Sequence, residues 1–288
     1  MLFRPQLVYT FLRYEIKRSV ARKKVLVLAL FTFLIGTSIY FLLDYVGNSG
    51  RLHQFLAPYL GYIWVVGVFM PQAFFVQFTA LLIAGGAMSE EYEAGTAELL
   101  LSKPITRAEY FVGKFLGGYL LLAFIILLNM VLAVGSATIT FGPQVSLGVL
   151  PIIFASQAFG AMLFFAVGFM FGEIVRRSSL SYIISSAAFI TSGAFGLILG
   201  FIYGLTSTPL YREIQYYLPT SAVTSLPSLL ASQHVPSGVT TLLGVLSFGG
   251  YVETSISFSV MLILLYSAAA LVIAFMYFEL VDVSRKAS

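Results

Sequence analysis

The sequence predicts an all-α protein that crosses a membrane six times. Hydrophobic residues make up 59% of its 288 residues and charged residues only 10%, whereas an ordinary soluble domain is about 25% charged. The mean hydropathy of +0.95 agrees with this difference. Apolar runs of about 20 residues, which a helix needs to cross a ~30 Å hydrocarbon layer, recur along the chain, whereas the alternating strands of a membrane barrel do not. The expected spans cover residues 25–43, 59–88, 111–137, 149–172, 180–204 and 254–278.

The positions of lysine and arginine predict that both termini are cytoplasmic. With this orientation, 14 of the 16 basic residues lie in cytoplasmic segments, and only Arg51 and Arg212 lie outside. Short cytoplasmic loops of membrane proteins carry such an excess of positive charge. The net charge of +4 therefore indicates contact with anionic lipid headgroups at the inner leaflet, and not binding of nucleic acid.

Two segments outside the spans have a predicted form of their own. Residues 1–24 place apolar and basic side chains on opposite faces of a helix, which favours an amphipathic helix in the inner interface; a plain basic anchor is the alternative. The external connection, residues 205–253, contains an apolar stretch interrupted by Pro219 and Pro227. This stretch is too short to span, and it predicts short re-entrant helices before the sixth span. We treat residues 1–288 as a single domain.

Polar and small residues inside the spans allow both a structural and a functional interpretation. The second span is interrupted by Pro71, with Gln72 and Gln77 close by; these amides either line a polar pathway or join helices by hydrogen bonds. The candidates for a pathway or a gate are Gln72, Gln77, Asn129, Pro219 and Pro227. The row Gly196, Gly200 and Gly204 permits close helix packing, either inside one subunit or across a dimer.

Several kinds of chemistry have no support in the sequence. The chain has no cysteine, which excludes disulfides and thiolate metal sites. The only Gly-Lys pair, Gly113-Lys114, lacks the other residues of a phosphate-binding loop, so we expect no nucleotide, cofactor or metal site and no enzyme activity in this chain. The acidic residues near the apolar runs lie at the span ends. This weakens an ion-coupled carrier, which usually keeps ionisable groups inside its spans.

Charge instead collects between the second and third spans. Residues 89–114 read SEEYEAGTAELLLSKPITRAEYFVGK and hold five of the twelve acidic and three of the sixteen basic residues. We predict a short amphipathic helix that continues the second span and carries Glu91 and Glu98 on one face. Pro104 ends this helix, and Thr106 with Glu109 forms a capping box for the next one. The result is a stiff cytoplasmic elbow that presents acidic residues and leucines, either as a docking surface or as a well-capped solvated loop.

This segment resembles the pattern that ATP-binding-cassette type-2 permeases carry after their second span. The pattern is E-x-x-x-G-T-x-E-L-L-L-[SA]-x-P-[IV]-[ST]-R-x-E-[YF]-x-x-G-K, and the six-span layout is similar as well. The matching positions are Glu91, Gly95, Thr96, Glu98, Leu99, Leu100, Leu101, Pro104, Ile105, Thr106, Arg107, Glu109, Gly113 and Lys114. The resemblance implies that residues 89–110 contain the coupling helix that docks into a separate ATPase subunit. It also implies a prokaryotic plasma membrane, two ATPase subunits that bind ATP and Mg, and a second permease copy or homologue.

The leading hypothesis is therefore the permease subunit of an ATP-driven exporter that works by alternating access. One alternative is a membrane scaffold that recruits a cytoplasmic partner without transport, and another is an ion-coupled secondary carrier. The many Phe and Tyr residues (27 and 17) favour lipidic, amphipathic or peptide-like cargo over small ions. The substrate, the transport direction and the choice between homodimer and heterodimer stay open.

Overall fold

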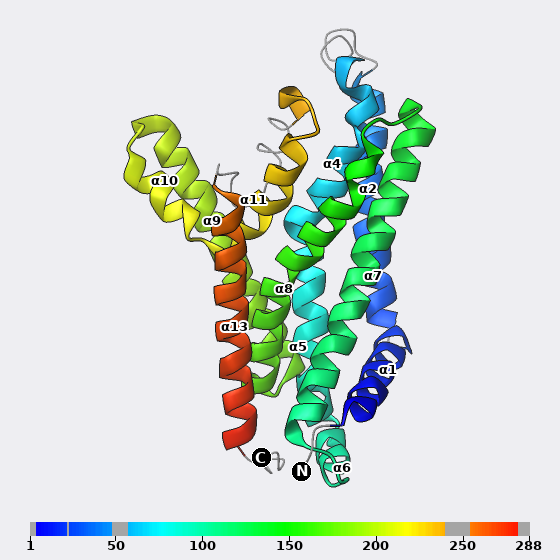
Figure 1. Cartoon of the computed structure of the whole chain (residues 1–288), viewed down its shortest axis with the longest axis vertical. Helices are drawn as coiled ribbons and strands as arrows, with labels where there is room; N and C mark the ends of the chain where they lie inside the picture. Colours follow the sequence, from blue (N-terminus) through cyan, green and yellow to red (C-terminus); the bar gives the residue numbers. More distant parts are fainter. Residues whose placement is uncertain (1–3, 22, 48–56, 240–253, 282–288) are drawn as a thin grey trace.

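The computed structural model describes residues 4–21, 23–47, 57–239 and 254–281, and all regular structure within these ranges is helical (Figure 1). Six helices in them are long and apolar enough to cross a membrane. This confirms the predicted all-α protein with six spans. The spans are built from α2 (Lys23–Gly47), α4 (Trp64–Pro71) with η2 (Gln72–Val76) and α5 (Gln77–Glu93), α7 (Arg107–Phe141), α8 (Leu150–Val175), α9 (Ser178–Thr206) and α13 (Ile256–Leu280). The shorter elements are α1 (Pro5–Ala21), η1 (Ala57–Tyr62), α6 (Thr96–Leu101), η3 (Leu147–Val149), α10 (Pro209–Tyr216) and α11 (Pro219–Ser232).

The second span bends at the proline that the sequence marks. Pro71 closes α4, and the next five residues form a π-helical turn, η2, before α5 begins. Proline lacks the N–H that would bond to the carbonyl four residues earlier, and wide turns of this kind are a common cause of helix kinks. The bend lets one continuous span of 30 residues, Trp64–Glu93, change direction near its middle.

The helix α5 forms the centre of the bundle. Within the second span 71% of the most apolar window is buried, against 28% in α2 and 22% in α9. The closest packing is between α5 and α8, where a Cβ at Gly168 would lie 2.9 Å from the carbonyl oxygen of Leu81, and one at Gly172 only 2.6 Å from that of Gly85. These glycines allow the two backbones to touch. We therefore expect α5 and α8 to move together.

The predicted external connection begins with a helical hairpin. After α9 the chain turns at Ser207, runs back along α9 as α10, and reverses into α11, which packs between α8, α9 and α13. The turn between α10 and α11 lies beside the middle of two spans: Ser192 and Thr220 hydroxyls are 3.0 Å apart, and Tyr266 donates to the Tyr217 carbonyl at 2.8 Å. Short helices are thus present where the sequence predicts them, and their re-entry into the membrane stays a prediction. Residues 240–253 of the connection lie outside the described ranges.

The helices α1 and α6 and the last turns of α13 lie at the same end of the bundle, which we call the inner end (Figure 1). There α1 runs obliquely along the first turns of α7. A Cβ at Gly113 would lie 2.5 Å from the Phe11 Cβ, and one at Gly117 would lie 3.0 Å from the Leu12 carbonyl oxygen. The predicted amphipathic helix is thus present, and it is packed on α7 by one face. Its position in the membrane interface stays a prediction.

Candidate functional site

The segment after α5 contains two helix ends and a short helix rather than one continued helix. The helix α5 ends at Glu93, and Gly95 adopts a left-handed conformation (φ +67°) before α6 begins at Thr96. The predicted continuation of the second span, with Glu91 and Glu98 on one face, is therefore wrong. The physical reason is that a left-handed residue ends a helix, and glycine adopts that conformation without the strain of a Cβ.

Replacing Gly95 with alanine is expected to destabilise this turn by about 1 kcal/mol, because alanine is strained at positive φ. A Cβ at this position would meet no atom within 4 Å, so the cost is conformational rather than steric. Gly95→Asn is the matched control, since asparagine tolerates the left-handed region. The check is the free energy of unfolding in detergent; equal losses for both variants would contradict the conformational explanation.

The second half of the segment is held by the predicted capping box. The Glu109 amide donates to the Thr106 hydroxyl at 3.2 Å, and the Thr106 amide donates to the Glu109 carboxylate at 2.8 Å. The other Glu109 oxygen accepts from the Arg4 amide at 2.6 Å, and the Arg4 guanidinium also donates to the Pro104 carbonyl. Glu109 is completely buried. It orders the start of α7 and is not available to a partner.

Fewer side chains in and around α6 are exposed than the sequence predicts. Leu99 is 67% exposed and Glu98 is also exposed, whereas Ala97 is buried. Leu100, Leu101 and Ile105 are half-buried and pack against the core cluster of α5, α7, α8 and α13. Since a six-residue helix has one inner and one outer face, the three successive leucines divide between the two. A partner would meet Glu98 and Leu99 first.

Glu91, expected on the docking surface, is instead buried in a network of charged side chains that we call the ionic junction (Glu15, Arg18, Glu90, Glu91 and Lys114). Lys114 is fully buried and donates to Glu15 at 2.5 Å, to Glu91, and to the Ala87 carbonyl at 3.3 Å. Arg18 donates to Glu91 at 2.8 Å and to Glu15 at 3.2 Å, and it lies 3.6 Å from Glu90. Tyr110 also donates its hydroxyl proton to Glu91. The junction ties α1, the end of α5 and the start of α7 together.

The last residues of α5 also form hydrogen bonds with α8 and α9. Glu90 accepts from the Tyr182 hydroxyl of α9 at 2.7 Å, and Glu93 accepts from the Ser178 amide at 2.9 Å. Tyr92 donates to both oxygens of Glu173 in α8 at 2.8 Å, and the Arg176 guanidinium lies 4.6 Å from the centre of the Tyr92 ring. The four consecutive residues 90–93 thus connect the base of α6 to α1, α7, α8 and α9.

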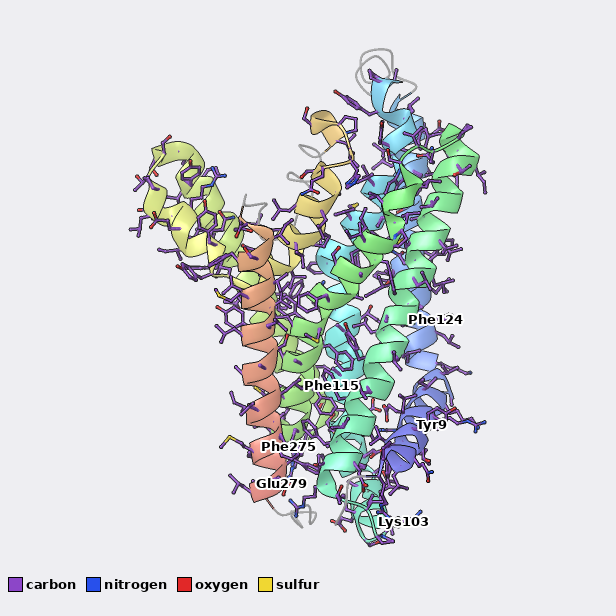
Figure 2. All side chains as sticks on the ribbon, in the orientation of Figure 1. Tyr9, Lys103, Phe115, Phe124, Phe275 and Glu279 are labelled. Carbon is purple, nitrogen blue, oxygen red and sulfur yellow. The ribbon has the colours of Figure 1, made fainter. Side chains whose placement is uncertain are left out.

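Arg107 has a structural contact that the sequence did not indicate. Its guanidinium donates to the carbonyls of Phe278 at 2.5 Å and Glu279 at 3.1 Å, the last turn of α13. A cation at the C-terminal end of a helix satisfies free carbonyls and matches the helix dipole. The segment is therefore joined to the sixth span as well. Figure 2 shows Lys103 and Glu279 at this end of the molecule.

Sequence reasoning did not single out Glu15, and it assigned the charges of Arg18 and Lys114 to topology, so none of the three was predicted to belong to a buried network. A signal was nevertheless present. Val8, Phe11 and Glu15 recur at helical spacing on one face of α1, so Glu15 continues an apolar stripe. A charged side chain in such a stripe is rarely buried unless it is paired. The place of Glu15 in this apolar stripe could therefore have predicted that a basic side chain is buried beside it.

The pathway candidates lie on several helices of the bundle. A Cβ at Gly36 would lie 3.2 Å from Pro71 and 3.4 Å from Asn129, so this amide lies among α2, α4 and α7. Gln77 is buried in α5. Pro219 and Pro227 belong to α11, on the side of α8, α9 and α13, and the side chain of Gln72 lies outside the described part. These residues thus lie on several different helices, and a pathway or gate formed by them stays a prediction.

The glycine row of α9 packs inside the subunit over part of its length. Gln215 of α10 donates to the Gly196 carbonyl at 3.1 Å, and a Cβ at Gly200 would lie 3.3 Å from the same side-chain nitrogen. A Cβ at Gly204 would meet nothing within 4 Å in the described residues. Gly196 and Gly200 thus both contact Gln215 of α10, and at Gly200 the missing Cβ leaves room for this side chain.

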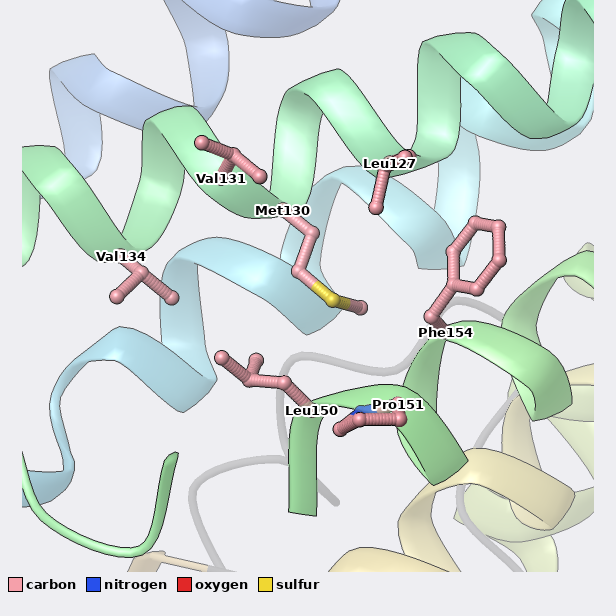
Figure 3. A pocket seen from close by; sticks show the side chains of 7 residues that line it. All are labelled: Leu127, Met130, Val131, Val134, Leu150, Pro151 and Phe154. Atoms are coloured by element: carbon pink, nitrogen blue, oxygen red, sulfur yellow. The ribbon is translucent and has the colours of Figure 1, made fainter. Parts of the chain in front are cut away.

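One cavity among the described residues lies between α7 and α8, away from the inner end. It measures about 370 Å³ and is lined entirely by apolar residues (Figure 3): Leu127, Met130, Val131, Val134, Leu150, Pro151 and Phe154. A smaller cavity of about 220 Å³ lies among α8, α9 and α13 beside Pro219 and Tyr266. The larger one offers no polar group to an ion or a sugar.

Comparison with known proteins identifies the family. Residues 9–283 match the family model described as "ABC-2 family transporter protein". The chain belongs to the ABC-2 transporter family. This ABC-2 protein is consequently a multi-pass protein of a prokaryotic cell membrane. It is similar to the probable ABC transporter permease protein NosY of Pseudomonas aeruginosa, with 34% identity over 128 residues. The aligned stretch covers 44% of this chain and 42% of that relative.

Proposed function

We propose that this ABC-2 protein is the membrane subunit of an ATP-driven exporter, and that α6 is the coupling helix which docks on a separate ATPase. Family membership supports a role in ABC transport. The observation that carries the coupling role is the construction of the inner end. A short helix with Glu98 and Leu99 exposed is placed between a left-handed glycine and a capping box.

The connections of α6 explain how a partner's movement reaches the membrane. Through residues 90–93, Lys114 and Arg107, the segment is bonded to α1, α7, α8, α9 and α13. The closely packed α5 and α8 continue this path toward the other side. Closure of the ATPase around ATP and Mg would thus tilt several spans together. Two ATPases and a second permease copy complete the proposed transporter, which alternates between inward and outward openings.

The docking role is tested by making Leu99 charged and by reversing the charge of Glu98, the two exposed residues of α6. Leu99→Asp and Glu98→Arg are expected to leave insertion and the melting temperature unchanged, and to lower ATP hydrolysis coupled to the membrane subunit at least tenfold. Leu100→Asp is a poorer test, because Leu100 packs against the core and its loss would also weaken the fold. Arg177→Glu, an exposed change at the turn between α8 and α9, is the control and should retain activity.

The experiment also separates the other hypotheses. The protein is purified from native membranes with its bound partners, and the complex is reconstituted into vesicles. An ATPase that co-purifies and drives transport supports the proposal. Partner binding without any transport would favour a membrane scaffold, and transport driven by an ion gradient without an ATPase would favour a secondary carrier. Full coupled activity in both Leu99→Asp and Glu98→Arg would remove α6 as the docking helix.

A further inference from the structure

The helix α1 has one buried face and one exposed face. One face packs on α7 and contributes Val8, Phe11 and Glu15, all buried. The opposite face carries Tyr9, Arg13 and Lys17, which follow each other every four residues and therefore form one row along the helix. We call this the basic row. Tyr9 is 64% exposed, the two cations are exposed as well, and neither cation makes an ion pair within the described residues. Figure 2 shows Tyr9 on the side of α1 that points away from the bundle.

The basic row lies where the inner end of the molecule meets its lipid-facing surface. Directly after α1, the side chains of Leu26, Val27 and Leu30 in α2 are more than half exposed. In a membrane protein such side chains contact acyl chains. In the predicted interfacial position of α1, Arg13 and Lys17 would lie at the level of the headgroups, shortly before the first exposed apolar turn of the first span. Tyrosine is also typical of this level, because one end of its ring is apolar and the other is polar.

We propose that the basic row binds the headgroups of anionic phospholipids in the inner leaflet and that this binding regulates the coupling of α6. The partner follows from charge complementarity and from continuity with the lipid-facing surface. Phosphate groups at this level attract lysine and arginine, and the aliphatic stems of both residues can lie along the apolar border. The regulatory part rests on the proposed function, whereas the lipid site does not.

The face of α1 that packs on α7 connects the proposed lipid site to α6. Arg18 follows Lys17 in the chain and lies about 100° further around the helix, where it donates to Glu91 at 2.8 Å and to the Ala87 carbonyl at 3.2 Å. Glu15 accepts from Lys114 at 2.5 Å. A lipid that fixes the position of α1 therefore also fixes the ionic junction at the base of α6. Loss of that lipid frees α1 to shift, and the junction with it.

The first experiment measures lipid binding without any ATPase. Since the chain has no cysteine, a single Val20→Cys on the exposed side of α1 carries a fluorescent dye. The protein is placed in nanodiscs in which either phosphatidylglycerol or phosphatidylcholine bears a quencher. We expect stronger quenching by phosphatidylglycerol, and a preference reduced about 30-fold in Arg13→Gln/Lys17→Gln, since two phosphate contacts are lost. Arg177→Gln, which neutralises an exposed cation elsewhere on the inner end, should keep the preference.

The second experiment measures coupled ATP hydrolysis by the complete complex as the fraction of phosphatidylglycerol rises. The wild type should respond to the lipid, and Arg13→Gln/Lys17→Gln should not. Arg18→Gln should retain the quenching preference but lose the response, because it breaks the link and not the lipid site. Equal quenching by both lipids would overturn the site. A preserved preference with no lipid response in the wild type would overturn the regulation. Absence of any ATPase would contradict the proposed function and leave the quenching result to decide on the site.

Discussion

Replacing Lys114 with methionine is expected to lower the free energy of unfolding by about 3–5 kcal/mol, the usual cost of removing one member of a buried ion pair. The ammonium group is fully buried and contacts the carboxylates of Glu15 and Glu91. Methionine has a similar shape and no charge. The carboxylates of Glu15 and Glu91 therefore stay buried but lose the cation that lies closest to them. Arg18 alone then faces Glu15, Glu90 and Glu91, which leaves excess negative charge inside the protein.

The measurement is denaturant unfolding of the purified protein in mixed micelles, followed by helical circular dichroism. Lys103→Met removes an exposed cation from the same segment and should change stability by less than about 0.5 kcal/mol. The double variant Glu15→Gln/Lys114→Met removes one carboxylate together with the ammonium and should recover part of the loss. If Lys114→Met unfolds like the wild type, the ionic junction does not hold the three helices together as described.

The second large effect is expected from filling the contact between α1 and α7. Gly113→Leu and Gly117→Leu should each destabilise the protein by about 3 kcal/mol, the upper part of the range for overpacked sites. At Gly117 even a Cβ would lie 2.8 Å from the Glu15 Cβ and 3.1 Å from the Leu12 Cα. Backbone atoms cannot move aside as a flexible side chain can, so α1 must separate from α7. The separation would also pull Glu15 and Arg18 out of the ionic junction.

The matched control lies on the same helix. A Cβ at Gly135 would meet nothing within 4 Å, and leucine favours helix over glycine by up to about 1 kcal/mol. Gly135→Leu should therefore be neutral or slightly stabilising. Protease protection of α1 in vesicles provides a second readout, since a released α1 is cleaved faster. Similar stability of Gly113→Leu, Gly117→Leu and Gly135→Leu would show that the close contact between α1 and α7 does not contribute.

Local chemistry explains why some features of the second span and of residues 89–114 were predictable. Thr106 and Glu109 form the capping box that their spacing predicts, because its hydrogen bonds join residues only three positions apart. Pro71 bends the second span because its missing N–H acts on the preceding turn of the same helix. In both cases the cause and the effect lie within one or two helical turns, so no knowledge of neighbouring helices is needed.

The role of individual charges was not predictable in the same way. Glu98 and Glu91 are both acidic residues near a span end, yet Glu98 is exposed and Glu91 is buried. The difference arises because Arg18 and Lys114, which are 73 and 23 residues away in the chain, meet Glu91. Gly95 contributes as well, because its left-handed conformation separates the two glutamates onto different helices.

The amino-acid order alone therefore established the six spans, the interruption of the second span at Pro71 and the capped start of α7. These features follow from hydrophobic length and from hydrogen bonds between near neighbours. Only the folded chain decided that residues 90–93 join α6 to the other helices, that Glu91 and Glu109 face inward, and that α1 is packed on α7 through Gly113 and Gly117. Those contacts join residues far apart in the sequence. Their surroundings have low polarity, so a charged side chain can be buried there only when it is paired.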